Sequence, residues 1–179
     1  MDIIVKNLCK TYNRNQVLDH FSCTFREKKM TCIMGKSGIG KSTLLSILMG
    51  LEKADEGTVS GMEHQKISAI FQENRLFENL DAVTNIHITT GKTKEEITGF
   101  LKKMELDDIA GKPVSEYSGG MKRRVAIARA LLAEYDILIM DEPTVGLDPR
   151  TRVEFKEILK DLKDQKKTVF ISSHILSEL

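Results

Sequence analysis

Long apolar runs, net charge and cysteine are all scarce in this chain. The apolar runs are far shorter than the ~20 residues that a membrane-spanning helix needs. The formal net charge is +1, whereas binding a nucleic acid requires a basic face that neutralises phosphates. We therefore expect neither a membrane-spanning protein nor a nucleic-acid partner. The one basic cluster, Lys122-Arg123-Arg124, is short and is interpreted as the solvated face of a helix.

Targeting and redox signals are equally sparse. Residues 1–6 lack the charged start and long apolar run of a secretory signal. The three cysteines, Cys9, Cys23 and Cys32, are scattered and show no metal-ligand spacing. We interpret them as reduced, mostly buried thiols of a cytosolic protein, and not as a disulfide or a metal site.

Repeats, low-complexity tracts and linkers rich in proline or glycine are also absent. The chain has 179 residues, of which 41% are hydrophobic and 30% charged, as is ordinary for a soluble globular protein. This length suffices to bury a core, so we expect one domain over residues 1–179.

Strand and helix patterns alternate along the chain. Apolar and β-branched runs predict strands over residues 3–12, 17–25, 30–34, 57–60, 67–72, 136–140 and 168–172. Helical periodicity predicts helices over residues 42–49, 121–134 and 149–165, and a small helical lobe over about 73–117. This alternation predicts an α/β fold with a mostly parallel sheet core and a small antiparallel β lobe.

The most informative motif is a glycine-rich loop of the form G-x-x-x-x-G-K-[ST] between a predicted strand and a predicted helix. Its residues are Gly35, Lys36, Ser37, Gly38, Ile39, Gly40, Lys41 and Ser42, and the predicted nucleotide site extends to Thr43. The glycines let backbone N–H groups curl around a phosphate, and the helix N-terminus adds positive partial charge. Lys41 would reach the β- and γ-phosphates, and the Ser42 hydroxyl would bind Mg²⁺. The loop therefore predicts binding of a nucleoside triphosphate.

An acidic pair, Asp141 and Glu142, follows the apolar strand at residues 136–140. Open α/β sheets bind ligands at the carboxyl ends of their strands. One carboxylate there would hold Mg²⁺, and the second would polarise an attacking water. The alternative is an acidic pair that caps a helix, but the phosphate-binding loop upstream favours the catalytic interpretation.

Further motifs, in a fixed order, resemble those of ATP-binding cassette (ABC) proteins. The segment at 117–121, Tyr-Ser-Gly-Gly-Met, resembles the family signature, and the segment 146–148, Gly-Leu-Asp, matches the D-loop. Gln72 matches the Q-loop, His174 the switch histidine, and Tyr12 the aromatic residue that stacks on adenine. Because order and spacing agree from about residue 3 to residue 177, the chain is identified as a member of this family. The resemblance implies the P-loop NTPase ABC-ATPase fold, with ATP and Mg²⁺ as cofactors.

The resemblance also implies a role for each matching residue. Glu142 would be the general base and His174 would sense the γ-phosphate, with Lys41 and Gln72 completing the catalytic set. Ser42, Gln72 and Asp141 would serve Mg²⁺. The in-trans residues Ser118, Gly119 and Gly120 and the D-loop residue Asp148 would act across a head-to-tail dimer of two cassettes.

Each assignment has an alternative. Tyr12 fits a residue that packs against a sheet, Gln72 an ordinary polar residue at a strand end, and His174 a capping residue. The chain also departs from the family pattern. Tyr117 and Met121 replace the usual leucine and glutamine, and the antiparallel lobe is expected to be trimmed. Relatives carry more residues after the switch histidine, so we expect a C-terminally short domain.

Two segments, residues 70–77 and 119–126, resemble the ATPases of nitrate, sulfonate and taurine importers. We therefore predict the ATPase subunit of a bacterial ABC transporter. It would power import through separate transmembrane permease subunits, together with a substrate-binding protein. It would be cytoplasmic and peripheral to the inner face of the cell membrane. Alternatives are an efflux or lipid-handling ATPase and a non-transport cassette, although the latter class usually carries coiled coils or a duplicated cassette.

The loop at residues 73–81 is the predicted docking surface for a permease subunit. It contains three apolar residues, Leu76, Phe77 and Leu80, in a polar segment that leads away from the predicted active site. Loops that a rigid sheet positions commonly carry partner contacts. The alternative is that these side chains cover the small helical lobe.

Overall fold

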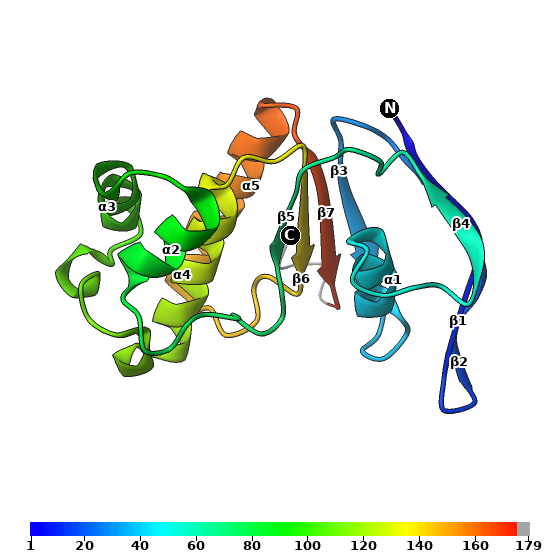
Figure 1. The fold of residues 1–179 in the computed structure, drawn as a ribbon, viewed down its shortest axis with the longest axis horizontal. Helices are drawn as coiled ribbons and strands as arrows, with labels where there is room; N and C mark the ends of the chain where they lie inside the picture. The colour runs from blue at the N-terminus through cyan, green and yellow to red at the C-terminus, as the bar shows by residue number, and fades with distance from the viewer. Residues whose placement is uncertain (175–179) are drawn as a thin grey trace.

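The computed structural model describes residues 1–174 and contains two sheets, with one helix between them and the remaining helices on the far side of the larger sheet (Figure 1). The larger sheet is parallel and has the order β3-β7-β6-β5. Its strands are β3 (Met30–Met34), β7 (Thr168–Ser173), β6 (Ile137–Asp141) and β5 (Ile67–Ile70). The prediction of an α/β fold with a parallel core is therefore confirmed.

The two central strands of the parallel sheet, β6 and β7, are buried along their whole length. Helices cover both faces of this sheet, so continuous apolar runs replace the alternation of a half-exposed strand. In the described part of the chain β3 is an edge strand that pairs with β7. Cys32 on β3 is exposed, while Cys23 is half-buried. The expectation of mostly buried thiols is thus wrong for Cys32, although all three cysteines are free.

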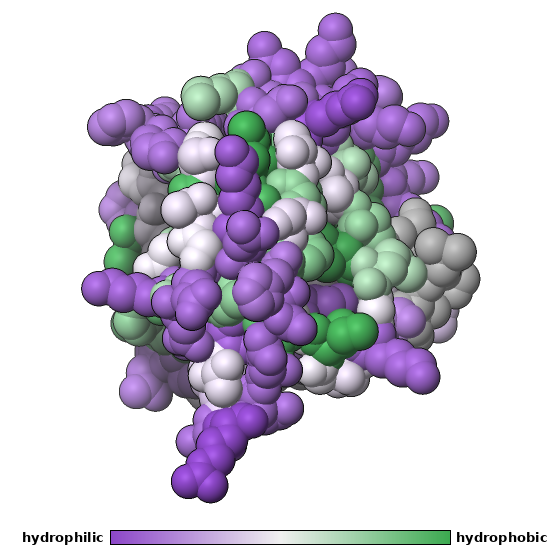
Figure 2. Space-filling model, turned by 90° about the vertical axis from the view of Figure 1, so that its right-hand side faces the viewer, coloured by the Kyte–Doolittle hydropathy of each residue, from purple (hydrophilic) through white to green (hydrophobic). Residues whose placement is uncertain are grey.

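The smaller sheet is antiparallel, with the order β2-β1-β4. Its strands are β1 (Ile3–Tyr12), β2 (Asn15–Phe25) and β4 (Glu56–Ser60). Asn13 and Arg14, both with positive φ, form the tight β1–β2 turn, so the turn is shorter than the sequence pattern predicts. Many hydrophilic side chains cover the outer side of the molecule at this sheet (Figure 2).

Helix α1 (Lys41–Leu48) lies between the two sheets (Figure 1). It packs in a core cluster that includes Leu8 of the small sheet, Leu45 of the helix and Phe170 of the parallel sheet. Because both sheets pack against the same helix, the position of β1 is fixed relative to the carboxyl ends of the parallel strands, near the start of α1.

A helical lobe follows β5. It comprises α2 (Ala82–Thr90), α3 (Lys94–Lys103) and two short 3₁₀ turns at Asp107–Ile109 and Val114–Glu116. A capping box begins α3 as predicted, because Thr93 and Glu96 each accept the other's backbone N–H. No helix among residues 1–174 is long and apolar enough to cross a membrane.

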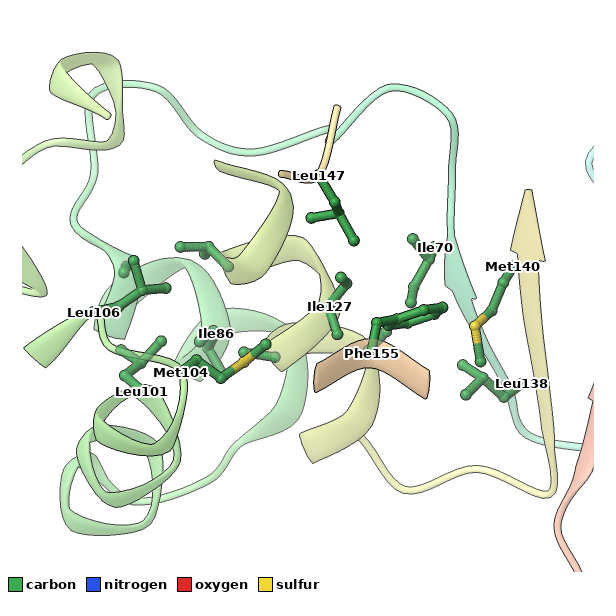
Figure 3. Packing of buried hydrophobic residues seen from close by; sticks show 14 of the residues in the cluster. Ile70, Ile86, Leu101, Met104, Leu106, Ile127, Leu138, Met140, Leu147 and Phe155 are labelled. Atoms are coloured by element: carbon green, nitrogen blue, oxygen red, sulfur yellow. The ribbon is translucent and has the colours of Figure 1, made fainter. Parts of the chain in front are cut away.

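One hydrophobic cluster joins the helical lobe to the parallel sheet (Figure 3). It runs from Ile86 and Leu101 in the lobe through Ile127 of α4 (Gly119–Leu132) to Phe155 of α5 (Pro149–Asp164) and Met140 of β6. Helix α4 is therefore the element through which the lobe contacts the sheet.

Candidate nucleotide-binding site

The glycine-rich loop connects β3 to α1 at the carboxyl edge of the parallel sheet. Gly38 and Gly40 have φ of 82° and 100°, a region that glycine adopts without strain. A Cβ at Gly40 would lie 2.9 Å from the carbonyl oxygen of Val17, so no larger residue fits there without movement. Gly40 is also the N-cap of α1 and supplies no side-chain cap. The first N–H groups of this helix have no partner within the helix, and such a helix start is suited to bind an anion.

A cavity of about 330 Å³ lies at this loop and gathers most of the predicted site. Its lining consists of Tyr12, Val17, Ser37, Gly38, Gly40, Lys41, Ser42, Thr43, Gln72, Glu142, Val145 and His174. Gly35, Lys36 and Ile39 belong to the same loop but do not line the cavity. The tertiary structure therefore brings the phosphate-binding loop, the Q-loop residue, the acidic residue and the histidine to one place.

Lys41 is the buried cation of this cavity. Its ammonium donates to the carbonyl oxygens of Gly35 at 2.8 Å and Lys36 at 3.1 Å, and it lies 3.3 Å from Oε1 of Glu142. Because its side chain is folded back over the loop, its charge lies where the loop N–H groups would bind a phosphate. Lys41 and Glu142 thus place opposite charges on neighbouring walls of the cavity.

The hydroxyl of Ser172 contacts both residues of the acidic pair at the end of β6. Ser172 on β7 donates through Oγ to Oδ1 of Asp141 at 2.6 Å and accepts the backbone N–H of Glu142 at 2.8 Å. Glu142 has φ of 47°, an uncommon conformation for a non-glycine residue that clusters at functional sites. At this bend Glu142 lines the cavity, whereas Asp141 is buried and does not line it.

His174 contacts Glu142 on the side away from Lys41. It follows β7, and its Nδ1 lies 2.7 Å from Oε2 of Glu142. Glu142 therefore touches Lys41 through one carboxylate oxygen and His174 through the other. Asp141, Glu142 and His174 come from neighbouring strand ends, although 32 residues separate Glu142 from His174 in the sequence.

Tyr12 stands at the opposite wall of the cavity. Its side chain lies at the end of β1, and the residue is 38% exposed. Partial burial and a hydrogen bond with Glu52 raise its pKa, and the ammonium of Lys10 lies 5.2 Å from the ring centroid. The ring is therefore exposed to the cavity, unlike a residue that packs inside a sheet.

The signature residues lie outside this cavity. Ser118 is the N-cap of α4 and accepts the N–H of Met121 at 3.2 Å, while Ser118 and Gly119 are exposed. Asp148 caps α5 by accepting the N–H and the hydroxyl of Thr151, and these bonds lower the pKa of its carboxyl group. Within the described residues, the signature is thus an exposed helix start that makes no contact with its own chain's cavity.

Arg123 is a residue of this region that the sequence interpretation placed wrongly. It is only 2% exposed, not solvated, and it donates to backbone carbonyl oxygens around the acidic pair. The physical reason is that its side of α4 faces the carboxyl edge of the sheet. Its position offered a signal, because Ile127 and Ala130, four and seven residues later, are apolar and share its helix face.

Comparisons with known proteins agree with this geometry. A family model described as "ABC transporter" matches residues 18–145. The lantibiotic transport ATP-binding protein SrtF of Streptococcus pyogenes is 36% identical over 185 residues, which cover 98% of this chain and 81% of that protein. The aliphatic sulfonates import ATP-binding protein SsuB 1 of Agrobacterium fabrum is 38% identical over 180 residues, covering 97% of this chain and 65% of that protein.

The fold is shared with a solved cassette. The ATP-binding cassette MJ0796, determined as a dimer in a post-hydrolysis state with ADP and Pi, superposes with a TM-score of 0.87. It is 30% identical in sequence, and the match covers 98% of this chain and 89% of that chain. This chain therefore belongs to the ABC transporter family as an ATP-binding cassette, an enzyme that binds and hydrolyses ATP.

Proposed function

We propose that the cavity at the start of α1 is the ATP site, and that this chain couples ATP hydrolysis there to transport through separate membrane subunits. The observation that carries the proposal is the shared cavity lining, because the loop, Gln72, Glu142 and His174 come from four separate segments. The loop amides and Lys41 would bind the phosphates, as expected for N–H groups and an ammonium around an anion.

Mg²⁺ fits the donor set beside this loop. Ser42 and Gln72 line the cavity and offer a hydroxyl and an amide oxygen, and the buried carboxylate of Asp141 comes from the end of β6. Oxygen donors of this kind suit Mg²⁺. When bound, the ion would neutralise charge that develops on the phosphates.

Glu142 is the proposed general base. Its carboxylate is held between Lys41 and His174, so its orientation is set before a nucleotide enters. A carboxylate so placed accepts a proton from an attacking water, while His174 would orient the γ-phosphate. The second cassette would supply Ser118, Gly119 and Gly120 to this site, since Ser118 and Gly119 are exposed at the start of α4.

The direction of transport that we propose is import. Support comes from the identity with SsuB 1 and from the similarity of residues 70–77 and 119–126 to importer ATPases. Export is the second candidate, because SrtF is a lantibiotic transport protein and the chain matches most of its length.

Reconstitution distinguishes the two directions. The cassette would be co-expressed with the membrane subunits encoded beside its gene and placed in proteoliposomes. Import predicts that an extracytoplasmic substrate-binding protein stimulates ATP hydrolysis. Hydrolysis that responds only to a substrate offered on the cassette side would establish export instead.

The loop at residues 73–81 is the proposed docking surface. Phe77 is 53% exposed, while its backbone N–H and carbonyl are both bonded to the buried side chain of Asn85. The loop thus holds an apolar ring in solvent on a fixed backbone. A hollow of about 400 Å³ beside Phe71 and Arg75, next to this loop, offers room for a partner segment. Leu76 instead packs against the core, as the alternative interpretation requires of that residue.

Phe77→Glu is expected to abolish co-purification with the membrane subunits while the isolated cassette stays folded and binds ATP. The reason is that a charge would replace an exposed apolar contact without disturbing Asn85. Val153→Glu, at an apolar residue of α5 that is 60% exposed, is the matched control and should leave co-purification unchanged. A large fall in the melting temperature of Phe77→Glu would show instead that Phe77 belongs to the lobe core.

Tyr12→Ala is expected to weaken ATP binding by about 1–2 kcal/mol, the scale of stacking between a base and an aromatic ring. Tyr12→Phe and Tyr12→Trp should retain most of the affinity, because both keep an aromatic face toward the cavity. Fluorescent ATP titrations of the three variants provide the measurement. Equal affinity across all three would contradict a stacking role.

A further inference from the structure

The side chain of Arg123 donates hydrogen bonds to two segments of the proposed site, the one with Glu142 and the one with Gln72. Its Nε donates to the carbonyl oxygen of Pro143 at 2.9 Å, and its Nη2 donates to that of Glu142 at 2.8 Å. Its Nη1 donates to the carbonyl oxygen of Phe71 and lies 3.4 Å from that of Gln72. One guanidinium therefore bridges the backbone of the proposed base and the backbone of the Q-loop residue.

Hydrogen bonds to backbone carbonyl oxygens stabilise the buried positive charge of Arg123. The residue is 2% exposed, and burial lowers the pKa of its guanidinium to about 10, with the charge of Asp141 opposing this shift. It remains protonated at neutral pH, because this pKa lies well above 7. A buried cation is costly unless its hydrogen bonds are satisfied, so both loops must keep their carbonyl groups in place around it.

Arg123 lies on α4, the helix that begins at the signature residues. It is one turn into this helix, which starts at Ser118-Gly119-Gly120. Arg129, further along the same helix, donates to the carbonyl oxygens of Asn74 at 3.0 Å and Arg75 at 2.6 Å. The Q-loop backbone is thus bonded to α4 at two points, and Arg123 also reaches the segment that carries Glu142.

We propose that Arg123 is a positioning residue that holds the Q-loop and the Glu142 segment in one arrangement with the signature helix. In this arrangement one guanidinium fixes the positions of Gln72 and Glu142 relative to each other. The flat, branched guanidinium suits this task because it donates in several directions at once, which an ammonium on a flexible stem does not. The proposal rests on the proposed roles of Glu142 and Gln72.

The first experiment compares Arg123→Met and Arg123→Lys with Arg124→Met. Arg124 is the matched control, because its Nη1 donates to the carbonyl oxygen of Met104 in the lobe, away from the cavity. Arg123→Met should lower kcat by about 10- to 100-fold, the effect of a misplaced catalytic group. The Kd for ATP should change by less than about 3-fold, since the phosphate-binding loop is untouched. Arg123→Lys should fall between Arg123→Met and wild type, and Arg124→Met should keep wild-type kcat.

A second experiment repeats Arg123→Met in a Glu142→Gln background. If Arg123 acts by positioning Glu142, the residual single-turnover hydrolysis of the double variant should equal that of Glu142→Gln alone. A further loss of the same size as in the wild-type background would show a general structural effect and overturn the proposal. So would equal kcat in the folded Arg123 and Arg124 variants.

The Glu142→Gln single variant, measured alongside, distinguishes a failure of the Arg123 proposal from a failure of the proposed base. If Glu142→Gln hydrolyses ATP at the wild-type rate, the proposed base is wrong and Arg123 loses its target. A second outcome is that Glu142→Gln is inactive while both Arg123 variants have the same kcat as Arg124→Met. The assignment of the base would then hold, and only the role of Arg123 would be rejected. Melting curves of all variants restrict the comparison to folded protein.

Discussion

Replacing Glu142 by glutamine is expected to remove nearly all ATP hydrolysis and to leave ATP binding intact. The carboxylate lies 3.3 Å from Lys41 Nζ and 2.7 Å from His174 Nδ1, so it is oriented at the wall of the cavity without a nucleotide. An amide of the same shape keeps these neighbours but cannot accept the proton of an attacking water. Loss of a general base lowers the rate by about 10²–10⁴-fold.

Single-turnover hydrolysis and fluorescent ATP binding measure the two effects separately. The variant should also accumulate as an ATP-bound dimer in gel filtration, because ATP hydrolysis, which would let the dimer dissociate, is blocked. Lys41→Ala is the contrasting variant and should lose nucleotide binding itself, since it removes the buried charge of the proposed phosphate site. Wild-type turnover of Glu142→Gln would reject the assignment of the base.

Mixing Ser118→Arg chains with Lys41→Ala chains is expected to restore activity that neither variant has alone. Ser118 and Gly119 are exposed and do not line the cavity of their own chain, so under the proposed in-trans role a partner would supply them to complete the site. In a mixed dimer, one site combines an intact Lys41 with an intact signature. The other site carries both substitutions and stays inactive.

If two chains form each site, specific activity is expected to rise with protein concentration. Association of two chains must overcome about 4–15 kcal/mol of lost translational and rotational freedom, and bound ATP at the interface offsets part of it. The solved relative MJ0796 is a dimer. A dilution series with sedimentation in ATP gives the measurement. Flat specific activity in a protein that stays monomeric with ATP would rule out the in-trans role of Ser118.

Local sequence patterns predicted the elements well, because each depends on neighbouring residues. The apolar run before the glycine loop forms β3, and the capping box at Thr93 begins α3. The family and the fold are likewise confirmed by the matching family model and by the solved cassette. The roles of Gln72, Glu142 and His174 remain predictions until the variants are measured.

The environment of Arg123 was not predictable from its neighbours in sequence. Charged residues usually face solvent, and a basic triplet in a helix supports that default. Its hydrogen-bond acceptors lie about 20 and 50 residues away in sequence, on either side of the helix in chain order. Likewise, the exposure of Cys32 follows from the edge position of β3, which only strand order reveals.

The sequence by itself determined that this chain has a phosphate-binding loop, an acidic pair after an apolar strand and an ABC signature, because short motifs carry their own backbone chemistry. Only the tertiary structure decided how these parts meet. Parallel pairing of β6 with β7 brings Glu142 to His174, the helix between the sheets brings Tyr12 to the loop, and the packing of α4 buries Arg123. Strand order and the packing of α4 depend on contacts between distant segments, which the short motifs do not contain.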